Sequence, residues 1–133
     1  MKTVDPNPLL LPDILAKLPD NTPIVMVNLL RFRDQALYRD GTADCSGREA
    51  YARYVALAQK NLAEVGAKLL YVGNAHACVI APQEEQWHEV LLVRYPSVRA
   101  FASMLAMPDY RAAAAHRTAA LDDARLIATV EHT

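Results

Sequence analysis

The sequence predicts an α+β domain in which a small antiparallel sheet carries helices on one of its faces. Short apolar runs typical of strands alternate with segments whose apolar residues recur at helical spacing. Proline, glycine and capping residues stand between these segments, where strands and helices usually end. At 133 residues and 53% hydrophobic, the chain has the length of one domain and can bury a core without disulfides or metals.

Residues 1–22 form a lead to the main domain, which spans 23–133. The lead is rich in proline, and its residues 9–18 favour a short helix. Pro12 interrupts this helix and Pro19 ends it, because proline lacks the backbone N–H group that a helix needs. We therefore expect a single short helix in the lead.

A polar loop separates the first strand from the first long helix. Residues 24–30 predict the strand, since six of the seven are apolar. The loop over 34–46 is long for a compact domain. Ser46 and Glu49 have the spacing of a capping box, and Gly66 stands where a glycine often ends a helix, so the helix lies between them. Its apolar stripe consists of Tyr51, Tyr54, Val55, Ala58, Leu62 and Val65.

Two further strands follow this helix. Residues 67–72 and 75–81 predict a second strand, which bends or bulges at Gly73 and stops at Pro82. A turn of Gln and Glu residues leads to a third strand over 87–95.

A pair of helices and a last strand complete the chain. Ser97 is a suitable N-cap for one helix, and Pro108 opens another over about 109–121. Two aspartates at 122–123 predict a turn, and 126–130 predict the last strand. The order strand, helix, strand, strand, helix pair, strand is a split βαβ arrangement repeated once, which is the ferredoxin-like fold. Four antiparallel strands with helices over one face are its compact form.

Both faces of these strands are apolar, although helices of a single chain cover only one. In the first strand Ile24, Met26 and Leu30 alternate with Val25, Val27 and Leu29. In the third strand Trp87, Leu91 and Val93 alternate with Val90 and Leu92. Monomers rarely expose an apolar face of this size. We therefore expect a two-fold homodimer through the sheet face, the alternative being that the lead folds across it.

Charge and composition argue against several classes of partner. Lys and Arg number 14 against 15 Asp and Glu, and no basic cluster suited to nucleic acid or an anionic membrane is present. No apolar stretch is long enough to span a bilayer, and no signal peptide is recognisable. The two cysteines, Cys45 and Cys78, predict no disulfide framework. We expect a cytoplasmic protein that binds neither nucleic acid nor membranes.

Several segments together resemble a known bacterial family. They are 27–32 (VNLLRF), 47–54 (GREAYARY), 95–97 (YPS) with Phe101 and Met104, 108–110 (PDY) and 115–121 (AHRTAAL). Over about 23–131 the chain resembles the domain of unknown function 1330 family, within the dimeric α/β-barrel superfamily. The resemblance implies a ferredoxin-like fold whose dimer closes two sheets into a barrel. It implies no single reaction, because the superfamily includes cofactor-free monooxygenases, haem-handling enzymes, isomerases and proteins that only bind ligands.

Polar residues at otherwise apolar positions are the candidates for a functional site. Asn28 is the one polar residue in the first strand, where an amide either orients a ligand or makes a structural hydrogen bond. His116 is the candidate catalytic residue, because histidine transfers protons near neutral pH. Arg117 is suited to binding a carboxylate, and Tyr110, two helical turns earlier, shares its face. The alternative role for this pair of cations is to stabilise a helix end.

Two further substrate-binding candidates are Arg31, which follows the first strand, and Tyr54 of the apolar stripe. A solvated strand end and a core position are their alternatives. His76 and Cys78 face the same way on a strand, but they lack the further ligands that a metal site needs, so we expect no metal. No phosphate-binding loop or nucleophile motif is present, so we expect no cofactor.

These observations leave two hypotheses. In the first, the chain is a cofactor-free enzyme, of monooxygenase or isomerase type, for a small, mostly apolar metabolite with a polar handle. His116 would then move a proton, Asn28 would orient the substrate, and Arg31 or Arg117 would bind an anionic group. In the second, the chain is a dimeric binding or regulatory module that uses the same residues without catalysis.

Overall fold

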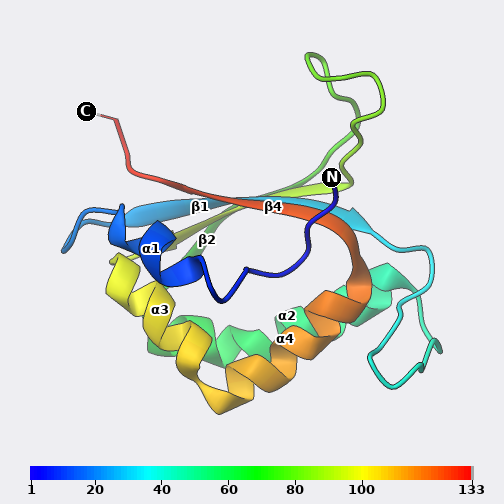
Figure 1. Cartoon of the computed structure of the whole chain (residues 1–133), viewed down its shortest axis with the longest axis horizontal. Coiled ribbons are helices and arrows are strands. Elements are labelled where there is room, and N and C mark those ends of the chain that lie inside the picture. Colours follow the sequence, from blue (N-terminus) through cyan, green and yellow to red (C-terminus); the bar gives the residue numbers. More distant parts are fainter. Residues whose placement is uncertain (133) are drawn as a thin grey trace.

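The structure, a computed structural model, describes residues 1–132 and contains one four-stranded antiparallel sheet in the order β2-β3-β1-β4 (Figure 1). The elements in chain order are α1 (Leu11–Ala16), β1 (Ile24–Phe32), α2 (Gly47–Glu64), β2 (Lys68–Asn74), β3 (Glu89–Tyr95), α3 (Val98–Ala106), α4 (Pro108–Ala120) and β4 (Leu121–Thr129). This order and topology confirm the predicted α+β, ferredoxin-like fold. Thr133, the last residue of the predicted domain, lies outside the described residues.

β1 lies at the centre of the sheet, between β3 and β4. Its side chains alternate between two faces, as a strand requires. Those that face the helices include the buried Ile24, Met26, Leu30 and Phe32. Those of the opposite side, the outer face, include the half-buried Val25, Val27 and Leu29. No helix of the described chain covers the outer face (Figure 1).

The helices pack on one side of the sheet, where α2 lies against α4 (Figure 1). The predicted capping box opens α2, since Ser46 Oγ accepts from the Glu49 N–H group and Glu49 Oε1 accepts from the Ser46 N–H group. Gly47 follows at a point of close approach, because a Cβ atom there would overlap the carbonyl oxygens of Arg33 and Ala120. The end of β1, the start of α2 and the end of α4 therefore meet at this glycine.

The buried apolar residues form two clusters, one under each half of β1. The first includes Leu30, Phe32, Tyr51 and Leu121. The second includes Ile24, Met26, Tyr95, Phe101 and Tyr110. Asn28 stands on the helix side of β1 between Met26 and Leu30, where the two clusters adjoin. The core is thus interrupted at the middle of the central strand.

The last strand begins earlier than the sequence pattern indicates. The predicted turn at 122–123 is wrong, because α4 runs directly into β4 and both aspartates lie within the strand. Each carboxylate finds a cation there. Lys2 Nζ is 2.9 Å from Asp122 Oδ1, and Arg125 Nη1 is 2.6 Å from Asp123 Oδ1. These ion pairs allow two acidic residues to be accommodated in a paired strand.

The predicted strand over 75–81 is also wrong. β2 ends at Asn74, and its bulge lies between Leu69 and Tyr71 instead of at Gly73. The Ala75 N–H group still donates to the His88 carbonyl at 2.9 Å, but beyond this bond the chain leaves the sheet and finds no partner strand among the described residues. Residues 75–88 form a projecting arm on the outer-face side (Figure 1).

The N-terminal lead starts at the edge of the sheet, where the Met1 carbonyl accepts from Arg125 Nη2 at 3.0 Å, and from residue 3 onward it lies on the helix side. The Ala124 N–H group of β4 donates to the Thr3 carbonyl at 2.6 Å, which aligns the lead with the sheet edge. Residues 3–18, named here the strap, then run beneath β4 towards α3 and contain α1 (Figure 1). The lead therefore does not cover the outer face.

Candidate ligand cavity

A cavity of about 620 Å³ lies between the sheet and the helices, at the position where the two core clusters adjoin. β1 and β3 contribute its floor, α2, α3 and α4 contribute walls, and the strap lines the remaining side. Most of the lining is apolar and includes Leu15, Met26, Leu62, Leu91, Val93 and Leu105. The interior is therefore suited to the hydrocarbon part of a small molecule.

Two tyrosine hydroxyls meet in this cavity. Tyr54 Oη of α2 and Tyr110 Oη of α4 are 2.9 Å apart. Burial, with a smaller effect of the Tyr110 side chain, raises the pKa of Tyr54 far above its ordinary value of 10.0. Burial likewise raises the pKa of Tyr51, which also lines the cavity. Because one hydroxyl of the pair donates to the other, one O–H group remains to donate to a ligand.

Asn28 places an amide on the cavity floor. Its only side-chain hydrogen bond among the described residues runs from Nδ2 to the Met26 carbonyl at 3.5 Å, which is at the limit of a hydrogen bond. Neighbouring strands satisfy the backbone on both sides, since Asn28 lies opposite Leu91 and Leu126. The amide therefore retains capacity to bind a polar group in the cavity.

Arg117 brings a guanidinium group to the strap side of the cavity. Its side chain is 12% exposed, and its Nη1 donates to the Val4 carbonyl at 2.7 Å. The nearest carboxylate is that of Asp5, with Oδ1 3.8 Å from Nη1. Thr118 Oγ1 also donates to Asp5 Oδ1, at 2.8 Å. The strap thus supplies the polar partners of a mostly buried cation.

His116 lies outside the cavity, although it precedes Arg117 in the sequence. Its Nδ1 is 2.7 Å from Tyr38 Oη, in the loop before α2, and Arg53 Nη1 donates to the same hydroxyl at 3.2 Å. The His116 and Tyr38 rings meet edge to face with their centroids 5.4 Å apart. His116 therefore anchors the loop to α4 in this structure and does not converge with Asn28 and Arg117.

Arg31 does not line the cavity either. It belongs to the outer-face row of β1, and its Nε is 3.5 Å from Asp122 Oδ2. Of the six predicted site residues, the structure gathers four in the cavity and leaves His116 and Arg31 elsewhere. The four are Asn28, Tyr54, Tyr110 and Arg117.

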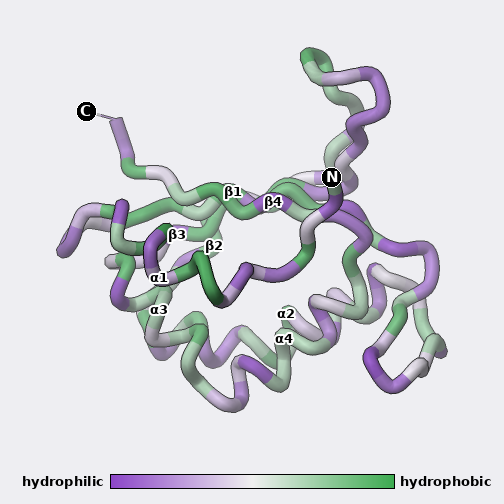
Figure 2. The backbone as a smooth tube through the Cα atoms, in the orientation of Figure 1, coloured by the Kyte–Doolittle hydropathy of each residue, from purple (hydrophilic) through white to green (hydrophobic). Residues whose placement is uncertain are grey.

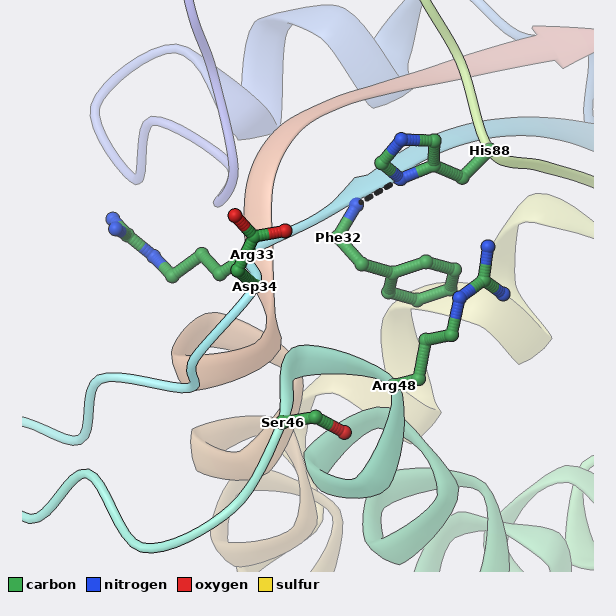
Figure 3. Close-up of a pocket in the computed structure, with 6 residues that line it drawn as sticks. All are labelled: Phe32, Arg33, Asp34, Ser46, Arg48 and His88. Atoms are coloured by element: carbon green, nitrogen blue, oxygen red, sulfur yellow. Dashed lines mark hydrogen bonds between the residues drawn. The ribbon is translucent and has the colours of Figure 1, made fainter.

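A smaller hollow of about 140 Å³ lies at the end of β1 and is lined by Phe32, Arg33, Asp34, Ser46, Arg48 and His88 (Figure 3). Its His88 and Arg48 side chains already have structural partners. His88 Nδ1 accepts from the Phe32 N–H group at 3.0 Å, and Arg48 lies over the Phe32 ring at 4.7 Å from its centroid. Desolvation, with the charges of Arg48 and Arg31, lowers the pKa of His88 and favours the neutral acceptor. We therefore interpret this hollow as part of the packing at the end of β1 and not as a ligand site.

The sequence pattern did not identify three residues that contribute to the cavity, namely Tyr51, Val4 and Asp5. Tyr51 could have been suspected, since it belongs to the same apolar stripe as Tyr54. The stripe alone does not distinguish residues that line a cavity from residues packed in the core. No local pattern points to Val4 or Asp5, because their role arises from contacts with α4, more than a hundred residues along the chain. No cluster of three or more potential metal ligands occurs within residues 1–132, and none of their helices is long and apolar enough to cross a membrane.

Comparisons with known proteins identify relatives of the same fold. A family model described as "Domain of unknown function (DUF1330)" matches residues 38–131. RPA0582, a protein of unknown function from Rhodopseudomonas palustris, is 36% identical, with a TM-score of 0.90 over 100% of this chain and 99% of its own. The methylated RPA0582 protein is likewise 36% identical, with a TM-score of 0.92 over 99% and 96% of the two chains.

A more distant structure shares the fold alone. A dimeric protein of unknown function and ferredoxin-like fold from Bacteroides fragilis is 11% identical, with a TM-score of 0.53 over 85% of this chain and 100% of its own. No curated protein matches the chain significantly.

Proposed function

We propose that this chain, which belongs to the DUF1330 family, is a homodimeric binding protein for a small, mostly apolar carboxylate. The observation that carries the proposal is the cavity between sheet and helices. Three elements direct a hydroxyl pair, an amide and a guanidinium group to its otherwise apolar lining. Its volume of about 620 Å³ falls within the roughly 300–1,000 Å³ of small-molecule sites.

The polar groups favour an anionic ligand. The Arg117 guanidinium and the remaining tyrosine hydroxyl are donors, and Arg pairs with carboxylates through two parallel hydrogen bonds. In the present arrangement the Asp5 carboxylate is 3.8 Å from Arg117 Nη1, which is long for such a pair. A ligand carboxylate would take the place of Asp5 beside Arg117, while its apolar part would fill the space between Tyr54 and the sheet.

A cofactor-free enzyme is the second candidate, and the Tyr54–Tyr110 pair is the observation that favours it. Donors held at a buried position stabilise an oxyanion that forms during a reaction. Proton transfer also needs a base within reach. His116 does not line the cavity, and of the described lining residues only Asp5 is acidic. Binding without conversion is therefore the better supported of the two functions.

The homodimer would form through the outer face of the sheet. Its apolar residues are Val25, Val27, Leu29, Tyr71, Val90, Leu92 and Ile127. Tyr71 and Ile127 are 56% and 51% exposed in the single chain. The strap lies on the opposite side, so a second copy is the available cover for this face. The Bacteroides fragilis protein, which shares the fold, is dimeric, and this supports a homodimer without specifying the face through which it forms.

Ligand binding is tested by thermal shift and calorimetry with benzoate and octanoate, using benzyl alcohol and octan-1-ol as neutral controls. We expect the carboxylates to stabilise the protein by about 2.7 kcal/mol at 100 times their dissociation constant, and the alcohols to stabilise it less at the same concentration. Arg117→Gln should weaken carboxylate binding by about 10- to 100-fold, since hydrogen bonds to charged groups contribute about 1.5–3 kcal/mol. Alcohol binding should remain.

Arg111→Gln is the matched control, because Arg111 is exposed on the same helix and lies outside the cavity lining. Equal carboxylate affinity in the Arg117→Gln and Arg111→Gln variants would refute the anionic site. Chemical analysis of the ligand after incubation separates the two candidate functions. Recovery of unchanged ligand supports binding, whereas conversion that Asp5→Asn abolishes would support the enzyme.

A further inference from the structure

The arm, residues 75–88, is the most exposed apolar segment of the described chain outside the N-terminus. Val79 and Ile80 at its tip are 93% and 96% exposed. The arm projects from the sheet on the same side as the outer face, and its far end is hydrophobic along one limb and hydrophilic along the other (Figures 1 and 2). Such exposure of two β-branched aliphatic residues is unfavourable in water unless another surface covers them.

The base of the arm is fixed against the sheet. Trp87 is buried, and its Nε1 donates to Glu85 Oε2 at 3.1 Å. Arg125, whose position opposite Leu29 places it on the outer face of β4, lies over the Trp87 ring at 5.3 Å from its centroid. The Glu85 N–H group donates to the Pro82 carbonyl at 3.0 Å, which closes a turn in the arm. The first and last of these contacts shape the arm, and the contact of Arg125 with Trp87 joins its base to β4.

The outer face alone is small for a dimer interface. Four strands about 4.8 Å apart, each about 3.3 Å per residue over seven to nine residues, have a projected area of about 500 Å². Each partner in a stable dimer buries about 800 Å² of accessible surface. Even with the added relief of the side chains, the face by itself stands at the low end, and the arm would supply further area beside it.

We propose that the arm of each subunit lies against the second copy of this chain and buries Val79 and Ile80 there, so that the two arms clasp the sheet-to-sheet dimer. This inference rests on the proposed homodimer. A second copy is the fitting occupant because the arm and the uncovered face adjoin on one side of the molecule. A two-fold axis in the interface brings both arms onto the opposite subunit at once, which a self-complementary interface requires.

The test measures the dimer dissociation constant by sedimentation over a dilution series. The variants are Val79→Ser with Ile80→Ser for the arm, and Val27→Asp for the outer face. Leu9→Ser with Leu10→Ser is the matched control, since it removes two adjacent exposed apolar residues from the other side of the sheet. We expect the arm variant to raise the dissociation constant at least tenfold and the control to leave it unchanged. Circular dichroism verifies that each subunit is folded.

The outcomes separate the clasp from the dimer. A wild-type dimer that Val27→Asp dissociates and the arm variant leaves intact would overturn the clasp and retain the proposed dimer. A folded wild type that sediments as a single subunit at all concentrations would overturn both. Dissociation of a wild-type dimer by the arm variant, with the Leu9 and Leu10 control unaffected, would support the clasp.

Discussion

On the helix side of β1, Met26 and Leu30 are buried and Asn28 stands between them on the cavity floor. On the outer side, Val25, Val27 and Leu29 form an apolar row that no polar residue interrupts and no described element covers. One strand therefore presents two different surfaces in alternate residues. An interrupted row beneath helices leaves room for a small molecule, whereas a continuous row on an open face is suited to another protein surface.

The largest effects are expected when an aspartate is placed on each face of β1 in turn. Met26 is 3% exposed, so Met26→Asp buries an unpaired charge and should lower the free energy of unfolding by more than about 3 kcal/mol. Val27→Asp should leave a folded subunit and instead weaken the dimer by about 100-fold or more. Urea unfolding at low protein concentration and sedimentation measure the two effects. Similar unfolding of both variants would show that the faces do not differ.

Replacing the interrupting residue sharpens the comparison. Asn28→Leu should raise the free energy of unfolding by about 1 kcal/mol, because an apolar side chain replaces an amide with one weak hydrogen bond. The same change should weaken carboxylate binding about tenfold. Urea unfolding and calorimetry provide the measurements, with Asn74→Leu at the exposed end of β2 as the control. Tighter binding by Asn28→Leu would contradict a polar role for this amide.

A smaller effect is expected at the strap. Asp5→Asn removes the charge that competes for Arg117, so benzoate affinity should rise about threefold, within the range of a partly exposed ion pair. Titration calorimetry measures this change, and Asp13→Asn, exposed on α1, is the control. A fall in affinity would mean that Asp5 supports the ligand instead of competing with it.

The smallest effect is expected in the pH dependence of stability, at the C-terminal end of β1. The pKa of His88 is lowered by desolvation and by Arg48 and Arg31, against the opposing charges of Asp34 and Asp122. The unfolded chain therefore takes up a proton at a higher pH than the folded one, and this contribution to stability is lost as the pH falls below about 6.5. His88→Asn should reduce the fall in the urea midpoint between pH 7 and pH 5. An equal fall in the variant would assign the effect to other groups.

Much of the fold follows from local patterns. The capping box at Ser46, the N-cap at Ser97 and the glycine at Gly66 are all where the sequence indicates. The start of β4 could not be predicted, because Asp122 and Asp123 resemble a turn until their distant partners Lys2 and Arg125 are known. Local patterns report propensity, whereas ion pairs across the fold decide such a boundary.

The candidate site was predictable only in part, for a related reason. Asn28 is recognisable because a polar residue in an apolar strand needs an explanation. His116 and Arg117 are adjacent, and about 100° separates them around the helix. The alanines beside them give no apolar stripe that would show which residue points to the core. The contacts of Arg117 with the strap, which a local pattern cannot contain, resolve this ambiguity.

The direct passage from α4 into β4 has a consequence for the range of ligands. The Ala120 carbonyl accepts from the Arg33 N–H group at 2.9 Å, and Gly47 packs against the same carbonyl, so the point where the helix becomes a strand is tied to β1 and α2. We therefore expect the wall that carries Tyr110 and Arg117 to adapt less to a longer molecule than the strap does. Tolerance for ligand length would then come from the strap. Exchanging residues 3–18 between family members should therefore transfer the preference for ligand length along with the strap.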